Sequence, residues 1–303
     1  MKFKFLIDEF YLSSLFINIE DNLREIEWFV ELHKIIPKHL GDVYITKHLL
    51  SKSYNGIDNS DIFFPTVGKS RDIALEFSMT QQRYFKKYGA DEFTNIKQHG
   101  SHEFINFILN NELTPLITKF NYHKEGWWNT TIVKNFSIDD NPITCARELT
   151  SLHDKCTDEM FRSLVPALFP NIYFDCSNRT KLENFEISPI PIKWVVDSLS
   201  YLNDSAVEDY RKNPGQFMIE ASQKGHELSP ESTKTRRALK LMREREININ
   251  DSNVCCEWHF KYSKNNGGRI HFHFGYDVSD KAKVKTSGNP IVGIFAHHLE
   301  IAK

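Results

Sequence analysis

The chain has 303 residues, of which 40% are hydrophobic and 26% are charged, so it can bury a core and is not intrinsically disordered. Its 38 basic and 40 acidic residues nearly balance, which excludes a uniformly basic nucleic-acid binder and requires any basic binding surface to be local. The length suits two ordinary domains or one large domain.

Cysteine usage and the distribution of apolar residues predict the cellular compartment. The number of cysteines is odd and no C-x-x-C pair occurs, which favours reduced thiols over a disulfide framework. The N-terminal segment lacks an uncharged apolar stretch, and no run of eighteen apolar residues exists. We therefore expect a cytoplasmic protein without a signal peptide, a transmembrane helix or a membrane partner.

The region 1–205 is predicted to be an α-rich domain. Amphipathic or helix-typical spacing occurs in five segments, at 19–36, 77–88, 103–110, 143–169 and 194–202. Strand character is confined to the Thr- and Val-containing stretch around 127–136 and to 168–177. We interpret this domain as a sensor or a surface for a protein partner.

The region 206–303 changes character and is predicted to be a second domain. A helix over 206–228 is broken at Pro214-Gly215, and Ser229-Pro230-Glu231 is typical of a new helix start. The helix expected over 232–247 is basic, and its candidate contacts to a polyanion are Arg236, Arg237, Lys240 and Arg243. Strands follow at 254–262, 269–276 and 290–299. The fold class expected is α+β, with the α-rich region followed by a helix plus an antiparallel sheet.

The stretch GGRIHFHFGYD alternates in polarity as a half-buried strand does. A hairpin with an Asn-Asn-Gly loop would pair Lys264 with Gly268 and place His259 opposite His273. The same register places Lys261 opposite His271. One face then carries the aromatic core, and the other gathers the polar side chains of the two strands: Glu257, His259, Lys261, Arg269, His271 and His273.

Three interpretations of this polar face are open. It is a solvated sheet face, a zinc site, or a site for phosphate chemistry. For zinc, His271 and His273 lie about 7 Å apart along the strand, and the third ligand would be His259, His297 or Glu257. Arg269 and Lys261 on the same face oppose a dication.

Phosphate chemistry uses every residue type on this face. Cleavage of RNA without metal needs a base for the 2′-OH, an acid for the leaving oxygen and cations for the phosphoryl charge. We expect His271 or His259 to be the base and His273 the acid, with Arg269 and Lys261 stabilising the transition state. His298, in the closing strand, is predicted to be an accessory group.

A basic helix followed by an antiparallel sheet that displays His, Arg and Lys resembles the RelE/colicin-type (BECR-fold) endoribonuclease toxins. The resemblance covers 206–303 and rests on element order and residue type. It implies metal-independent RNA cleavage in a toxin–antitoxin or antiviral-defence setting, with Arg269 and Lys261 binding phosphate. The long preceding region departs from such toxins, which are commonly small.

The function expected is therefore a metal-independent endoribonuclease without a cofactor, acting as a toxin or antiviral-defence effector. Its partners would be RNA and a protein or antitoxin bound through the N-terminal region. Two alternatives stay open. One is a non-catalytic RNA- or protein-binding subunit of a defence complex, and the other is a zinc-dependent hydrolase that uses the His-x-His strand.

Overall fold

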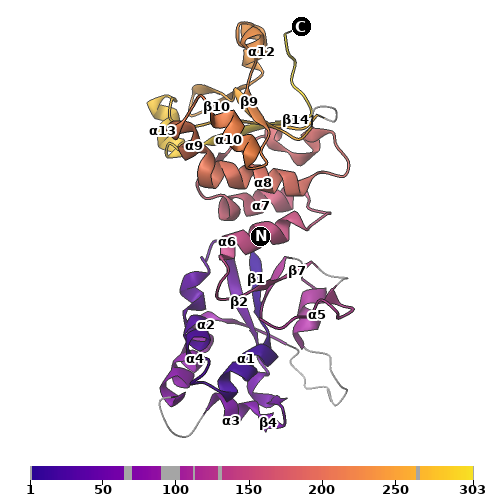
Figure 1. Ribbon diagram of the computed structural model, residues 1–303, viewed down its shortest axis with the longest axis vertical. Helices are drawn as coiled ribbons and strands as arrows, with labels where there is room; N and C mark the ends of the chain where they lie inside the picture. The colour runs from indigo at the N-terminus through magenta and orange to yellow at the C-terminus, as the bar shows by residue number, and fades with distance from the viewer. Residues whose placement is uncertain are drawn as a thin grey trace. The chain divides into compact units, whose positions relative to one another are not determined.

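The computed structural model describes residues 2–64, 70–89, 103–111, 113–128, 132–263 and 267–302. It contains two compact units, Met1–Leu149 and Thr150–Lys303, each with helices and at least one sheet (Figure 1). The predicted mixed α+β class is confirmed. The boundary expected near residue 205 falls inside the second unit, in a helical run that no Pro or Gly interrupts between Ile192 and Lys212.

A five-stranded parallel sheet forms the centre of the first unit, in the order β5-β2-β1-β6-β7. Its strands are β1 (Phe3–Ile7), β2 (Gly41–Thr46), β5 (Lys86–Tyr88), β6 (Thr114–Ile117) and β7 (Val133–Phe136). Only β7 had a predicted counterpart. The sheet escaped prediction because its strands are only three to six residues long, too short to show a clear alternation, and β5 consists of Lys86, Lys87 and Tyr88.

Helices complete the first unit, together with the short strand pair β3 (Ser53–Tyr54) and β4 (Ile57–Asp58). They are α1 (Glu9–Ile17), α2 (Leu23–Ile35), η1 (Leu49–Ser51), α3 (Asn59–Phe63), α4 (Ser70–Tyr84), α5 (Glu103–Leu109) and α6 (Pro142–Ser151). The amphipathic pattern over 19–36 is confirmed as α2, which packs beside α4 (Figure 1). The division between the units falls in the last turn of α6.

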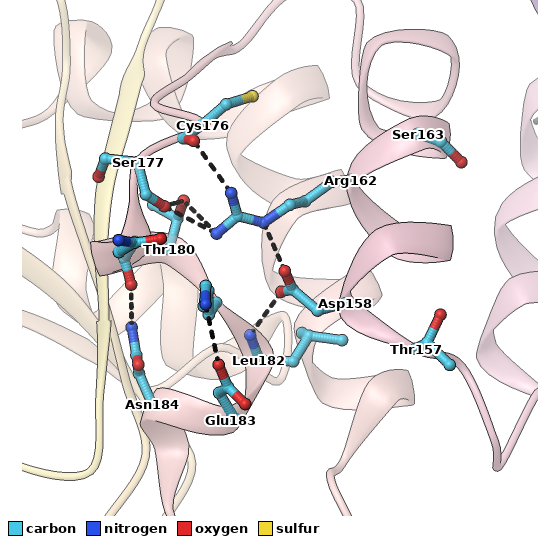
Figure 2. Close-up of polar contacts among 12 residues, drawn as sticks. Thr157, Asp158, Arg162, Ser163, Cys176, Ser177, Thr180, Leu182, Glu183 and Asn184 are labelled. Atoms are coloured by element: carbon cyan, nitrogen blue, oxygen red, sulfur yellow. Dashed lines mark hydrogen bonds and ion pairs between the residues drawn. The ribbon is translucent and has the colours of Figure 1, made fainter.

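The long helix expected over 143–169 is two helices, α6 and α7 (Asp158–Leu168), because the Thr157 side chain caps a new start by accepting from the Met160 amide. Arg162 of α7 then ties this helix to the following loop (Figure 2). Its guanidinium donates to the carbonyls of Cys176 and Ser177 and pairs with Asp158.

Further helices and short strands lead to the second sheet. They are β8 (Tyr173–Phe174), η3 (Asn178–Thr180), η4 (Leu182–Phe185), α8 (Ile192–Tyr201), η5 (Leu202–Ala206), α9 (Val207–Lys212) and α10 (Phe217–Gln223). The predicted break at Pro214-Gly215 is confirmed, since it separates α9 from α10.

The second sheet has five strands in the order β8-β14-β13-β12-β9, antiparallel except for the β8–β14 pair. The strands after β8 are β9 (Leu228–Pro230), β12 (Trp258–Lys261), β13 (Arg269–His273) and β14 (Ile291–Ala296). A separate hairpin, β10 (Glu246–Ile249) and β11 (Ser252–Cys255), and helix α13 (Asp280–Thr286) belong to the same unit.

The predicted pairing of the hairpin is wrong by two residues. His259 lies opposite His271, and Lys261 lies opposite Arg269. Lys264, one member of the predicted closing pair, lies outside the described residues. A shift of two preserves which face every side chain occupies, so the hydrophobic alternation predicts the faces correctly and leaves the register open.

The predicted basic helix over 232–247 is also wrong. Residues 228–230 form the edge strand β9, and two single-turn helices follow, α11 (Thr233–Arg236) and α12 (Leu239–Arg243). The extended backbone of Ala238 separates them. No residue of α12 is buried, and a helix without a buried face lacks the packing that normally stabilises it.

Across the described ranges, no helix is long and apolar enough to span a membrane.

Candidate functional site

A polar pocket of about 290 Å³ opens on the sheet of the second unit. β12 contributes His259 and Lys261 to its lining, and β13 contributes Arg269 and His271. His298, just beyond β14, also lines it. Residues from three neighbouring segments of the sheet, all singled out by sequence, therefore share one pocket.

The two faces of this hairpin differ as the alternation predicts. Trp258 and Phe274 pack edge to face at 5.4 Å between ring centroids, and Phe260 stacks on Phe272 at 5.0 Å. Phe217 of α10 packs against the same cluster. This aromatic face anchors the strands and holds the opposite, polar face in position.

The polar face is buried, so the interpretation as a solvated sheet face is wrong. The exposed fraction is 1% for His271, 9% for His259 and 8% for Arg269. The reason is the β10–β11 hairpin, whose apolar side chains pack against Ile294 of β14. Ile294 lies opposite His271 in the sheet register, so the hairpin covers the same face.

Burial keeps two of the histidines that line the pocket, His259 and His271, neutral. Burial, together with the nearby positive charges of Lys261 and Arg269, lowers the pKa of His259 to about 3. Burial likewise lowers the pKa of His271 well below its usual value, helped by His259 and Arg245. A neutral imidazole can accept a proton or bind a metal, but it cannot serve as a general acid.

Two functional candidates escaped sequence reasoning, Glu231 and Arg245. Arg245 is 1% exposed, and its Nε donates to Glu231 Oε1 at 2.9 Å. Its other nitrogens donate to the Leu241 and Glu300 carbonyls and to Glu244. Both residues occur in a highly charged stretch that is typical of an exposed helix. No periodic pattern of apolar residues around them indicates that they are buried.

Glu231, His259 and His271 form a group that could hold a metal ion. One ligand atom from each lies within 4.8 Å of the other two. Among the residues described, neither ring nitrogen of His271, nor Nδ1 of His259, makes a hydrogen bond of normal geometry, although the Cys256 backbone lies close to the His271 ring. Two predicted zinc ligands belong to this group, His271 and His259. His273, the other half of the predicted His-x-His pair, does not belong to it, and neither do His297 and Glu257.

The remaining predicted ligands and the predicted acid point elsewhere. His273 Nδ1 accepts from the Gly275 amide at 2.9 Å, and His273 does not line the pocket. His297 Nδ1 lies 3.2 Å from the Phe185 carbonyl. Glu257 lies 3.6 Å from the Arg236 guanidinium. The structure therefore separates His273 from the other predicted catalytic residues.

Arg269 also braces the hairpin loop. Its Nη1 donates to the carbonyls of Ser263, Gly267 and Gly268 at 2.8 to 3.1 Å. Gly267 and Gly268 both have positive φ, +73° and +76°, a conformation that favours glycine. The loop thus fixes the position of the guanidinium at the pocket wall.

The predicted polyanion contacts flank the pocket. Ser232 and Thr235 of the α11 segment line it, while Arg237, Lys240 and Arg243 are exposed. Arg236 is exposed as well, and its Nε donates to the Glu231 carbonyl at 2.9 Å. All four basic residues are therefore exposed, in the segment that follows β9.

A second buried acidic group lies in the first unit, where Asp8 follows β1. Its carboxylate accepts from the amides of Phe10 and Tyr11 and from the hydroxyls of Thr118 and Tyr122. Glu9, beside it, pairs with Lys52. These contacts account for Asp8 as the cap of α1 and as a link between β1 and the segment after β6.

Comparison with protein-family models, with curated proteins and with solved structures gives no significant match. We therefore infer a function from the chemistry of the pocket that His259, Arg269 and His271 line.

Proposed function

We propose that the pocket binds an RNA phosphodiester and cleaves it without metal, by attack of the 2′-OH on the adjacent phosphorus. The observation that carries this proposal is the meeting of His259, Lys261, Arg269 and His298 in one pocket of about 290 Å³. Two imidazoles and two cations are the groups that such a reaction requires.

His259 is the base in this proposal. It is neutral in the free protein and so can accept the 2′-OH proton. A pKa of about 3 makes it a weak base, but the lowering comes from burial and neighbouring cations. The negative charge of a bound phosphate offsets the neighbouring cations, favours the protonated ring and so raises the pKa. Lys261 and Arg269 then stabilise the charge on the phosphoryl oxygens.

His298 is the acid that protonates the leaving 5′-oxygen. It is exposed at the pocket, where solvent can supply its proton. This assignment replaces the one expected for His273, which lies outside the pocket. His271 is too buried to reach a substrate, and it acts as a positioning residue whose ring lies 5.0 Å from that of His259.

Exposed Arg237, Lys240 and Arg243 would bind the RNA backbone beside the pocket. The first unit would serve as a sensor or as the surface for a protein partner or antitoxin. The toxin or antiviral-defence setting rests on the RelE/colicin resemblance and stays a prediction.

Incubation of the full-length protein with cellular RNA in excess EDTA tests this proposal. We expect wild-type cleavage that leaves 2′,3′-cyclic phosphate ends, with losses of about 10²-fold or more in His259→Ala and His298→Ala. His273→Ala is the matched control, because it removes an imidazole of the neighbouring strand β13 that lies outside the pocket. RNA binding without cleavage would contradict the proposed ribonuclease activity and favour the alternative, a non-catalytic RNA-binding subunit.

A further inference from the structure

We propose that Glu231, His259 and His271 form a reversible site for one zinc-like divalent cation, and that its occupancy blocks RNA cleavage. Metal binding is independent of the proposed function, whereas the block rests on it. No metal is needed for the proposed cleavage step, so the ion would be an inhibitor.

The geometry of the three side chains comes first. One ligand atom from each lies within 4.8 Å of the others. Zinc bonds to nitrogen and oxygen of about 2.0–2.2 Å in a tetrahedral site require ligand separations of about 3.3 Å. Glu231 comes from the segment after β9, and the histidines from the paired strands β12 and β13, so the three approach one point from adjacent strands. The proposal requires side-chain rotations that bring the ligand atoms to this separation.

Hydrogen bonding is the second observation. His271 is 1% exposed, and neither of its ring nitrogens makes a hydrogen bond of normal geometry within the described parts of the chain, although the Cys256 backbone lies close to the ring. Nδ1 of His259 is also buried and makes no hydrogen bond to the described residues. Buried polar atoms in proteins are normally satisfied, and a coordinated ion satisfies one nitrogen of each ring.

Ligand chemistry selects the ion. Two neutral imidazoles with one carboxylate favour zinc and similar transition metals over Mg²⁺ and Ca²⁺, which prefer oxygen. The described contacts of the Glu231 carboxylate with Arg245 and His259 use Oε1, which leaves Oε2 for a metal. The positive charges of Arg245, Lys261 and Arg269 weaken the binding of a dication, so the site is reversible.

Occupancy and catalysis compete for His259. A metal on its ring takes the lone pair that must accept the 2′-OH proton, and it places an ion in the pocket where the phosphate would bind. The same three residues therefore predict that zinc inhibits and that a chelator restores activity.

Calorimetric titration of the full-length protein with ZnCl₂, together with the absorption spectrum on adding Co²⁺, tests the site without RNA. We expect one ion per chain and the visible bands of tetrahedral cobalt. His271→Ala and Glu231→Gln should each weaken binding at least about 10-fold, while His273→Ala, outside the pocket, should not. Glu231→Gln keeps a side chain of the same shape against Arg245 if His271→Ala does not fold.

No binding of zinc by the wild-type protein, or equal binding by the wild type and His271→Ala, would overturn the site.

The RNA assay then separates the two proposals. Zinc should inhibit the cleavage seen in EDTA, and Glu231→Gln should need at least about 10-fold more zinc for half inhibition. Stimulation by zinc would overturn the inhibitory role and favour the zinc hydrolase. Zinc binding to a protein that cleaves no RNA would confirm the metal site while the proposed function fails.

Discussion

The buried ion pair between Arg245 and Glu231 lies in the wall of the pocket. One substitution tests how much this pair contributes to the free energy of unfolding. Arg245→Met leaves the Glu231 carboxylate buried without its cation, which should lower the free energy of unfolding by about 3–5 kcal/mol. Urea unfolding followed by circular dichroism measures this. Arg243→Met is the control, because Arg243 is exposed and its loss should cost less than about 0.5 kcal/mol. Equal effects would contradict the structural role of the pair.

The buried histidines predict acid sensitivity. His259 has a folded-state pKa of about 3 against about 6.5 when unfolded. Between these values the unfolded chain binds a proton that the folded chain does not, so the free energy of unfolding falls as the pH decreases. The slope is up to about 1.4 kcal/mol per pH unit for this group, and its contribution is constant above pH 6.5.

His259→Gln removes that titration, so the variant should lose less stability than the wild type between pH 6.5 and pH 5. Urea midpoints at both pH values measure the difference. His39→Gln, at an exposed position of the first unit, is the control for a histidine substitution. An unchanged pH dependence in His259→Gln would show that His259 is not held neutral.

At the scale of elements, the β12–β13 hairpin shows what sequence can predict. Alternation correctly separated Phe260 and Phe272 from His259 and His271, because one face must enter an aromatic core. It could not fix the register, since a shift of two residues keeps every face. The parallel strands of the first unit escaped because they are three to six residues long, too short to show a clear alternation. Glu231 and Arg245 escaped because charge usually indicates exposure.

The hairpin loop supports a prediction of its own. In Gly267→Ala, the new methyl group would lie 2.5 Å from the His297 ring and 2.7 Å from its carbonyl oxygen, at φ +73°. We expect a loss of stability of more than about 1 kcal/mol and weaker RNA cleavage, because His297 adjoins His298.

Gly225→Ala is the matched control for that loop. Gly225 also has positive φ, +88°, but nothing lies within 4 Å of the added methyl group. It should lose only the backbone preference, about 1 kcal/mol, and keep its activity. Urea unfolding and the RNA assay compare the two variants, and equal activity losses would contradict the link between the loop and the pocket.

For the whole molecule, a net charge of −2 means that RNA binding must come from a local surface. Replacing Arg237, Lys240 and Arg243 with Ala should weaken RNA binding and reduce the slope of log affinity against log salt by about 0.7 for each phosphate that the variant no longer neutralises. The control replaces Lys281, Lys283 and Lys285 of α13, which are exposed in the same unit. Fluorescence anisotropy with a labelled RNA measures both, and equal slopes would contradict the proposed surface.

The central claim is cleavage by 2′-OH attack at the pocket of the second unit. The most direct measurement compares one defined RNA with its fully 2′-O-methylated counterpart, each incubated with the full-length protein in EDTA. We predict cleavage of the RNA alone, with 2′,3′-cyclic phosphate ends, and none with His259→Ala. Cleavage of both substrates, or undiminished cleavage by His259→Ala, would contradict the proposed mechanism.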